Sequence, residues 1–227
     1  MDQFHRFKLI IGNDSFNKIK SSNICVLGLG GVGSYVVEAL VRSGLYNITI
    51  VDFDKIDITN LNRQLMTNLN NIGFLKTDVI AERIKSINKD VNVVKIDKFI
   101  DSDNINLLFN NKYDYIIDCC DYINTKKLII KECINRNIKF ITCTGTGNKL
   151  DPSKLKICDI RKTSYDPICK ILRSYVKSEK ISKKVMCCYS SETPIKIDKK
   201  EIGSTSFVPA SAGLLIASYV INDIIKK

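Results

Sequence analysis

The chain has 227 residues, of which 44% are hydrophobic and 26% are charged, and its formal net charge is +11. This composition is that of an ordinary soluble globular protein with a sizeable core, in one large domain or two small ones. Nine cysteines without any C-x-x-C spacing, together with a charged N-terminal stretch, predict a cytoplasmic protein with buried thiols and exclude a typical signal peptide, disulfide framework or four-cysteine zinc site.

Short apolar runs alternate with amphipathic stretches over the first two thirds of the chain. The expected elements, in chain order, are a strand within 23–30, a helix from about 32 to 40, a strand at 47–54, a helix at 76–88, strands at 91–97 and 113–121, a helix over about 124–136 and a strand at 138–145. This alternation predicts an α/β fold with a doubly wound, mostly parallel sheet of the Rossmann-like, nucleotide-binding kind.

Beyond these strands the alternation loosens and the positive charge rises. Residues 148–200 hold 14 basic and 6 acidic side chains, against 19 and 16 in residues 1–147. A strand at 155–160, a helix starting near Asp166 and a basic loop at 177–184 are expected to form a C-terminal α/β extension. A basic half of this kind suits an enzyme that acts on a polyanion, although a lysine-rich composition throughout the chain explains the same charge.

The stretch from Gly203 to Asn222 carries no charged residue. Pro209 interrupts it, and its sustained apolar part, 210–221, is too short to cross about 30 Å of hydrocarbon. We therefore expect a helix that begins at Pro209 and packs against the sheet or a partner subunit, without stable insertion into a membrane.

The run ICVLGLGGVGSYVVEALVRSG contains a glycine fingerprint for phosphate binding. Gly28, Gly30, Gly31 and Gly33 allow backbone N–H groups and a helix N-terminus to approach a phosphate. Asp52 ends the next strand, where a carboxylate accepts hydrogen bonds from ribose hydroxyls. Up to this point an NAD-dependent oxidoreductase fits as well as an ATP-using enzyme.

Side chains downstream of the second strand favour ATP. Asn60, Arg63 and Gln64 follow that strand closely, and Lys76 comes soon after them. Hydride transfer does not need two cations beside a phosphate loop, whereas cleavage of ATP does, because negative charge builds on the phosphates as the bond to pyrophosphate breaks. Asp121 ends a further strand at the same edge of the sheet, and a carboxylate there suits Mg²⁺.

These motifs resemble those of the ubiquitin-activating-enzyme-like superfamily, whose members adenylate a carboxylate with ATP and Mg²⁺. Its pattern is G-x-G-G-x-G, D-x-D, N-x-x-R-Q, G-x-x-K and D-x-x-D. The matching residues, all expected around the nucleotide, are Gly28 to Gly33, Asp52 and Asp54, Asn60 with Arg63 and Gln64, Gly73 with Lys76, and Asp118 with Asp121. The resemblance implies that Asp52 binds the ribose and Asp121 the metal ion. It also implies that Asn60, Arg63 and Lys76 bind the triphosphate.

The superfamily places an arginine near the N-terminus that reaches into the ATP site of the partner subunit. Arg6 in FHRFKLIIG matches it, which implies a homodimer and a catalytic role for Arg6 beside Arg63, Lys76 and Asp121. The expected organisation is a single domain, 1–227, with an ATP-binding half, 1–147, and a basic half, 148–227, that faces the substrate and packs in the dimer.

The stretches GTGNKLDPSKLKICDIRKTSYDPICKILR and SSETPI are similar to the tRNA threonylcarbamoyladenosine dehydratase branch of this superfamily. That resemblance implies ATP-dependent cyclisation of threonylcarbamoyladenosine next to the anticodon, through adenylation of the threonine carboxylate and net loss of one water. Contacts to the tRNA are then expected from Lys149, Arg161, Lys162 and Arg173. A sulfur-trafficking protein as a further partner is left open.

Two alternatives remain. The first is an adenylating activator of a small ubiquitin-like sulfur carrier, against which the missing zinc cysteines and the basic half count. The second is an NAD-dependent oxidoreductase or a degenerate nucleotide-binding scaffold, neither of which needs a triphosphate-and-metal set. If the chain forms a thioester, Cys187 or Cys188 is the residue to test, and His5, the sole histidine, is the candidate general base. The dehydratase needs no protein nucleophile, because the attacking group is already tethered to the substrate.

Overall fold

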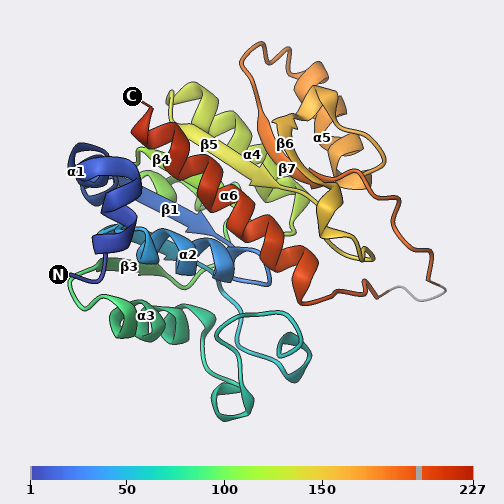
Figure 1. Ribbon diagram of the computed structural model, residues 1–227. Coiled ribbons are helices and arrows are strands. Elements are labelled where there is room, and N and C mark those ends of the chain that lie inside the picture. Colours follow the sequence, from blue (N-terminus) through green and yellow to red (C-terminus); the bar gives the residue numbers. More distant parts are fainter. Residues whose placement is uncertain (1, 198–200, 227) are drawn as a thin grey trace.

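The structure is a computed structural model, and it describes residues 2–197 and 201–226. A seven-stranded sheet runs through both halves of the chain in the order β3-β2-β1-β4-β5-β7-β6 (Figure 1). Neighbouring strands pair in parallel except β6 and β7, which are antiparallel. The predicted doubly wound, mostly parallel sheet is therefore confirmed.

The strands are β1 (Asn23–Leu27), β2 (Asn47–Val51), β3 (Asn92–Ile96), β4 (Tyr115–Asp118), β5 (Lys139–Cys143), β6 (Leu155–Asp159) and β7 (Met186–Ser190). The α-helices are α1 (His5–Ser21), α2 (Gly33–Arg42), α3 (Lys76–Ile87), α4 (Ile123–Asn135), α5 (Pro167–Ser178) and α6 (Phe207–Ile225). Two short 3₁₀ turns matter below, η1 (Ile58–Asn60) and η3 (Ile105–Phe109).

β1 lies in the middle of the sheet, hydrogen-bonded to β2 on one side and to β4 on the other. Because successive side chains of a strand point to opposite faces, Ile24 and Val26 join the core on one face and Cys25 and Leu27 join the core on the other. Helices cover both faces, so the strand reads as a continuous apolar run.

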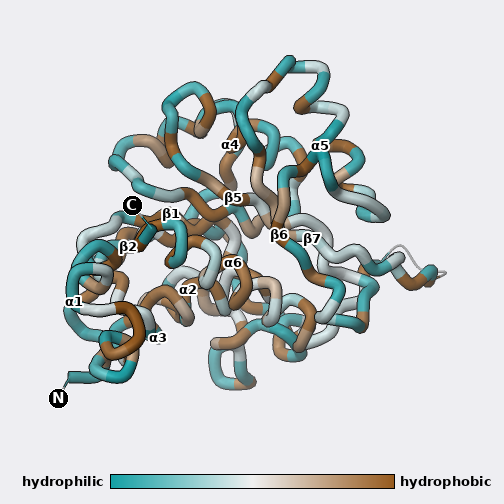
Figure 2. Tube along the Cα trace, turned by 45° about the horizontal axis from the view of Figure 1, so that its top comes forward, coloured by the Kyte–Doolittle hydropathy of each residue, from teal (hydrophilic) through white to brown (hydrophobic). Residues whose placement is uncertain are grey.

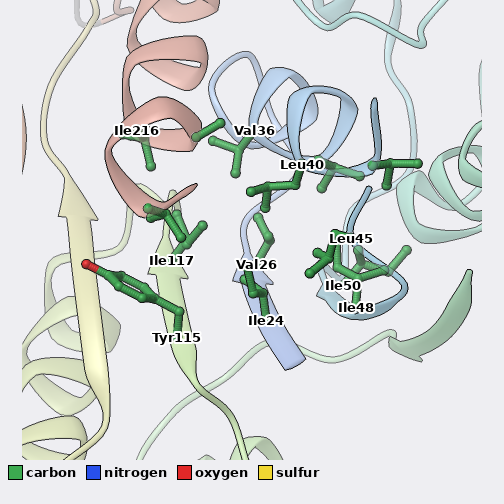
Figure 3. Close-up of a cluster of buried hydrophobic side chains, with 14 of the residues drawn as sticks. Ile24, Val26, Val36, Leu40, Leu45, Ile48, Ile50, Tyr115, Ile117 and Ile216 are labelled. Atoms are coloured by element: carbon green, nitrogen blue, oxygen red, sulfur yellow. The ribbon is translucent and has the colours of Figure 1, made fainter. Parts of the chain in front are cut away.

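The helices α1, α2, α3 and α6 cover one face of the sheet. Figure 3 shows Val36 and Leu40 of α2 and Ile216 of α6 on the helix side of this core, above Val26 and Ile117 of the strands. The opposite face is covered by α4, α5 and η3. Figure 2 shows the most hydrophobic segments along the strands between these layers, with hydrophilic segments toward the periphery.

α6 has 19 residues and, by length and composition alone, is long and apolar enough to cross a membrane. Half of the most apolar 18-residue stretch of this helix is buried within the protein. It packs so closely on α2 that a Cβ added to Gly213 would lie 2.5 Å from the carbonyl oxygen of Val32. The helix begins at Phe207 rather than at the predicted Pro209, because a proline is tolerated within the first turn of a helix.

The other predicted elements before residue 150 are found within about three residues of their expected ends, as is the strand β6. The helix expected near Asp166 is confirmed as α5, since the Cys169 N–H donates to the Asp166 carboxylate at 2.8 Å and Pro167 is the first helical residue. Two elements were not expected. α1 is largely polar, with Phe16 and Ile19 as its buried residues, and the run MCCYS of β7 lacks the branched apolar residues typical of strands.

Candidate functional site

The strand order reverses between β1 and β4, since the chain passes from β1 to β2 on one side and later adds β4 on the other. Loops that follow the two strands diverge there, and open α/β sheets bind ligands in the resulting crevice. A cavity of ≈ 370 Å³ lies at the carboxyl ends of these strands. Its walls include nearly all of the predicted nucleotide-binding residues, namely Gly28, Gly30, Gly31, Asp52, Asp54, Asn60, Arg63, Gln64, Lys76 and Asp121.

The loop between β1 and α2 is a turn that only glycine fits at two positions. Gly28 has a φ of +86°, and a Cβ on it would lie 2.6 Å from the backbone nitrogen of Cys120. A Cβ on Gly33 would lie 1.8 Å from the carbonyl oxygen of Gly28. The turn therefore closes on itself and brings the N-terminus of α2, a favourable place for an anion, to the cavity.

Asp52, directly after β2, is buried in the cavity wall and held by backbone groups. Its Oδ2 accepts a hydrogen bond from the Leu29 N–H at 2.7 Å, and its Oδ1 accepts one from the Asp54 N–H at 2.9 Å. Burial raises the pKa of Asp52, with Lys76 acting in the opposite direction. Each oxygen keeps a lone pair for a further donor, as a ribose hydroxyl requires.

Two cations border the cavity beside the glycine loop. Lys76 is the first residue of α3, and its buried ammonium donates to the Asp54 carboxylate at 2.7 Å. The Arg63 guanidinium donates to the Thr59 carbonyl at 2.8 Å and to the Asn62 side chain at 3.0 Å. Both cations are thereby fixed in place before a ligand arrives, which suits the binding of a polyphosphate.

Gln64 carries a buried amide oxygen that has no hydrogen-bond partner among the residues the structure describes. An unsatisfied buried acceptor of this kind costs about 1–3 kcal/mol, so a donor on a bound ligand would offset that penalty. Asn60 is already engaged: its side-chain oxygen accepts from the Asp57 N–H at 3.1 Å and closes the capping box of η1. Gln64 is therefore the more available of the two amides.

Lys126 lines the cavity and takes part in an ion pair that the sequence motifs did not reveal. Lys126, fully buried in α4, donates to the Asp118 carboxylate at 3.0 Å, to the Thr142 hydroxyl at 3.2 Å and to the Cys143 carbonyl at 2.6 Å. Asp118 also accepts from the Cys120 N–H at 3.1 Å. Burial alone would lower the pKa of Lys126, but the Asp118 carboxylate outweighs it and raises this pKa above its ordinary value.

The turn after β4 carries Asp121 and Tyr122 into the cavity wall, and both side chains are exposed. The Tyr122 ring meets Phe99 edge to face, with ring centroids 4.7 Å apart. Phe99 in turn meets Phe53 edge to face at 5.1 Å. The cavity therefore has an aromatic rim on the side of β2, β3 and β4, next to the Asp121 carboxylate.

Three of the basic residues expected to contact RNA have their charge engaged within the fold. The Lys149 ammonium is buried, pairs with the Asp166 carboxylate at 3.1 Å and donates to the Gly145 carbonyl at 2.8 Å, so the prediction that it reaches a phosphate is wrong. Arg161 pairs with Asp159 and donates to backbone carbonyls of the loop after α5.

Arg173 donates to the Thr163 carbonyl at 3.0 Å and to its hydroxyl, so it ties α5 to the turn before it. Lys162 is exposed. Neither residue lines the cavity.

The two cysteines singled out for a thioester are also in the core. Cys187 and Cys188 are fully buried in β7. A hydrogen bond between the Cys169 and Cys187 thiols and burial together raise the pKa of Cys187, and the neighbouring Cys143 and burial do the same for Cys188. A buried thiol with a raised pKa is a poor nucleophile, so the structure contradicts a thioester role for both. His5 lies in α1 and does not line the cavity.

Arg6 is exposed on α1 and does not line the cavity of its own chain. The start of α1 lies at the amino ends of the strands, opposite the cavity. There the ring of Phe4 lies 6.2 Å from that of Tyr46, the residue before β2. Figure 1 shows α1 at the end of β1 that faces away from the arrowhead.

A family model described as the ThiF family matches residues 3–226. The chain belongs to the ThiF family. The tRNA threonylcarbamoyladenosine dehydratase of Bacillus subtilis (strain 168) is 39% identical to it over 243 residues, covering 100% of this chain and 96% of that protein. The tRNA threonylcarbamoyladenosine dehydratase of Haemophilus influenzae is 36% identical, covering 94% of this chain and 90% of that protein.

A solved ThiF-family structure is similar over almost the same extent. The Escherichia coli tRNA N6-threonylcarbamoyladenosine dehydratase, TcdA, superimposes with a TM-score of 0.93 at 32% identity, covering 99% of this chain and 94% of that one. That protein has been solved in complex with AMP and in complex with ATP.

The ion pair between Asp118 and Lys126 yields a stability prediction. Lys126→Met leaves the Asp118 carboxylate buried without its cation, and we expect this to lower the free energy of unfolding by about 3–5 kcal/mol. Lys131→Met, at an exposed position of the same helix, should change it by less than about 0.5 kcal/mol. Urea denaturation followed by far-ultraviolet circular dichroism measures both, and equal effects of the two substitutions would contradict the assignment.

Proposed function

We propose that this ThiF-family chain catalyses the ATP-dependent dehydration of threonylcarbamoyladenosine next to the anticodon of tRNA. The observation that carries the proposal is the joint placement of a glycine phosphate loop, two fixed cations and an exposed carboxylate around one cavity at the strand-order reversal. Such a set suits the adenylation of a carboxylate by ATP. The likeness to dehydratases over nearly the whole chain supports the modified tRNA as the bearer of that carboxylate.

The reaction proceeds in two displacements. A carboxylate oxygen of the threonyl group attacks the α-phosphorus of ATP, which forms an acyl-adenylate and expels pyrophosphate. Arg63 and Lys76 offset the negative charge that builds on the departing phosphates. The neighbouring carbamoyl group then attacks the activated carbonyl, closes a ring, expels AMP and releases its N–H proton to the solvent. The AMP retains the oxygen that the carboxylate loses, so the net change in the nucleoside is the loss of one water.

The residues of the site fit a magnesium ion bound with the nucleotide. Asp121 offers an exposed carboxylate at the cavity wall, and Mg²⁺ prefers carboxylate, water and phosphate oxygens as ligands. Asp118, three residues earlier, is committed to Lys126, Thr142 and the Cys120 N–H, so it supports the turn instead of binding the metal. A bound Mg²⁺ would supply charge neutralisation at the phosphate oxygens.

The burial of the thiols supports direct attack by the tethered carbamoyl group. All nine cysteines are free and none is paired in a disulfide. Cys119 and Cys120 are partly exposed beside the cavity, yet burial raises the pKa of both thiols well above the ordinary value. Neither of these two thiols is activated for the covalent thioester that an enzyme of carrier-protein type would need. The free thiols also support a cytoplasmic location.

We propose in addition that the active form is a homodimer in which Arg6 enters the cavity of the partner subunit. Arg6 is exposed at the edge of the sheet opposite its own cavity, so it reaches a cavity only from another copy of the chain. The same helix exposes Leu9 and Ile10, which are 73% and 81% exposed, as apolar surface for such a contact.

The proposed reaction is tested by nucleoside mass analysis of tRNA that carries threonylcarbamoyladenosine, incubated with the protein with and without ATP and Mg²⁺. We expect an ATP-dependent loss of the mass of one water. Asp121→Asn should slow the reaction on the order of 100-fold, whereas Asp90→Asn, an exposed acid beside the amino end of β3, should not. Unchanged nucleoside with a folded protein would contradict the proposal and favour adenylation of a carrier protein's terminal glycine instead.

The dimer proposal is tested by mixing two inactive variants. Arg6→Ala and Asp121→Ala should each abolish dehydration, because one lacks the residue given to the partner and the other lacks a residue of its own cavity. After mixing and exchange of subunits, about a quarter of the wild-type activity should return, since half of the dimers are mixed and each mixed dimer has one intact cavity. Absence of rescue in a preparation shown by native mass spectrometry to contain mixed dimers would contradict the sharing of Arg6.

A further inference from the structure

A second hollow adjoins the cavity and has no role in the adenylation site. It is a groove of ≈ 1000 Å³ between α4 and α5. Its lining includes Phe99, Tyr122, Ile123, Asn124, Lys127, Leu128, Lys131, Ile171, Tyr175 and Glu179, and we name it the α4–α5 groove. Four residues line both the groove and the cavity: Phe99, Asp121, Tyr122 and Thr125. The two hollows are therefore continuous across the rim of the site.

We propose that the α4–α5 groove holds the nucleotide that adjoins the reacting nucleoside of the RNA substrate, with its base against the aromatic rings and its phosphates at Lys127 and Lys131. This inference rests on the proposed function, because it takes the reacting group to be part of an RNA. It assigns the groove a role in substrate binding that is separate from ATP binding.

The groove lies where an RNA chain would leave the cavity. A nucleoside inside an RNA is bonded to a nucleotide on each side, so the chain must leave the cavity through its rim. Asp121 and Tyr122 form that rim where the cavity passes into the groove. The groove thus begins at the rim of the cavity in which the reaction is proposed to occur.

Aromatic side chains line both hollows. Phe99 and Tyr122 line both hollows, whereas Phe53 lines only the cavity and Tyr175 only the groove. The edge-to-face pair of Phe99 and Tyr122 therefore lies at the junction of the two hollows. Exposed aromatic rings are the usual stacking partners of unpaired RNA bases, which suits a nucleotide of a loop.

Two lysines of α4 line the groove. Lys127 and Lys131 are one helical turn apart on the groove side of α4, and the Lys127 ammonium lies 5.7 Å from the centre of the Tyr175 ring. Three carboxylates also line the groove. Asp101 accepts hydrogen bonds from the N–H groups of Asp103 and Asn104, Asp121 lies at the junction with the cavity, and Glu179 follows the last residue of α5. The lysines thus offer cations beside aromatic rings, which a backbone of phosphates requires.

The groove offers accessible cations for the proposed RNA binding that three of the four predicted basic residues do not offer; the fourth, Lys162, is exposed but lines neither hollow. Contacts within the protein engage the charged groups of the other three, Lys149, Arg161 and Arg173. Lys127 and Lys131 have no ion pair with any residue that the structure describes. Their charges are therefore available to an external polyanion.

The test compares two double variants of the full-length protein. Lys127→Glu with Lys131→Glu reverses the charge of the groove, and Lys89→Glu with Lys112→Glu makes the same change at exposed residues that precede β3 and β4, at the opposite edge of the sheet. The probe is a fluorescent anticodon stem–loop carrying threonylcarbamoyladenosine, with binding followed by anisotropy at several salt concentrations. Circular dichroism confirms that each variant is folded.

We expect the groove variant to bind the stem–loop at least about tenfold more weakly and to lower the slope of log affinity against log salt by about 1.4, the value for two phosphate contacts to a single strand. Its affinity for ATP should stay within twofold of wild type, as should RNA binding by the control variant. Tyr175→Leu, which keeps an apolar side chain but removes the ring, should weaken RNA binding without changing the salt slope.

Unchanged RNA affinity in the groove variant would overturn the inference and leave the groove to a partner that is not RNA. An equal loss in both double variants would also overturn it, because the effect would then follow net charge alone. The outcome is separable from that of the proposed function. If the protein binds the stem–loop through the groove but never dehydrates it, the groove assignment stands and the proposed reaction is wrong. If it dehydrates the tRNA but the groove variant binds RNA normally, the reaction stands and the groove assignment is wrong.

Discussion

The ion pair between Asp118 and Lys126 is the contact on which the arrangement of the site depends. It joins β4 to α4 and reaches β5 through the Thr142 hydroxyl and the Cys143 carbonyl. Through the Cys120 N–H it also holds the turn that presents Asp121 and Tyr122. A buried pair of this kind is weak evidence for net stability, but loss of one partner is strongly destabilising. Its role here is to set the direction of a turn that serves both the cavity and the groove.

The lysines of this chain perform different tasks according to their burial. Lys126 and Lys149 are fully buried, and each has its carboxylate and backbone acceptors within the fold. Lys76 and Lys126 both border the cavity, but the Lys76 ammonium donates to Asp54 alone among the described residues, so its charge is held in position and still available to a ligand. Lys127 and Lys131 lie at the surface of α4. A net charge of +11 thus says little about RNA binding unless the burial and the partners of each lysine and arginine are known.

Much of the fold and of the nucleotide site follows from local sequence patterns. The alternating strands and helices, the glycines that a tight turn requires, and the polar residues that end β2 and β4 are all short-range features. The glycine loop and the ends of β2 and β4 meet at one side of the sheet, because the carboxyl ends of parallel strands all lie on that side. The cavity therefore collects residues as distant in sequence as Gly28 and Asp121.

The remaining features depend on tertiary contacts that no local pattern contains. Lys149 lies in a basic stretch of the sequence, yet its partner Asp166 is in a different element, the cap of α5. The sequence holds one sign that Lys126 is buried: it lies on the same side of a predicted helix as the apolar residues Ile129, Ile130 and Cys133. β7 was missed because its core residues are cysteines and a tyrosine, and the α4–α5 groove because it arises only where two helices pack.

In the proposed reaction the carboxylate of the substrate is activated by transfer of AMP and is then displaced within the same molecule. Both displacements can be followed with tRNA whose threonylcarbamoyl carboxylate is labelled with heavy oxygen, in a single turnover with ATP and Mg²⁺ and with mass analysis of the products. We expect one heavy oxygen in AMP and one in the cyclised nucleoside, with unlabelled pyrophosphate. Unlabelled AMP, or release of ADP and phosphate in its place, would rule out this route.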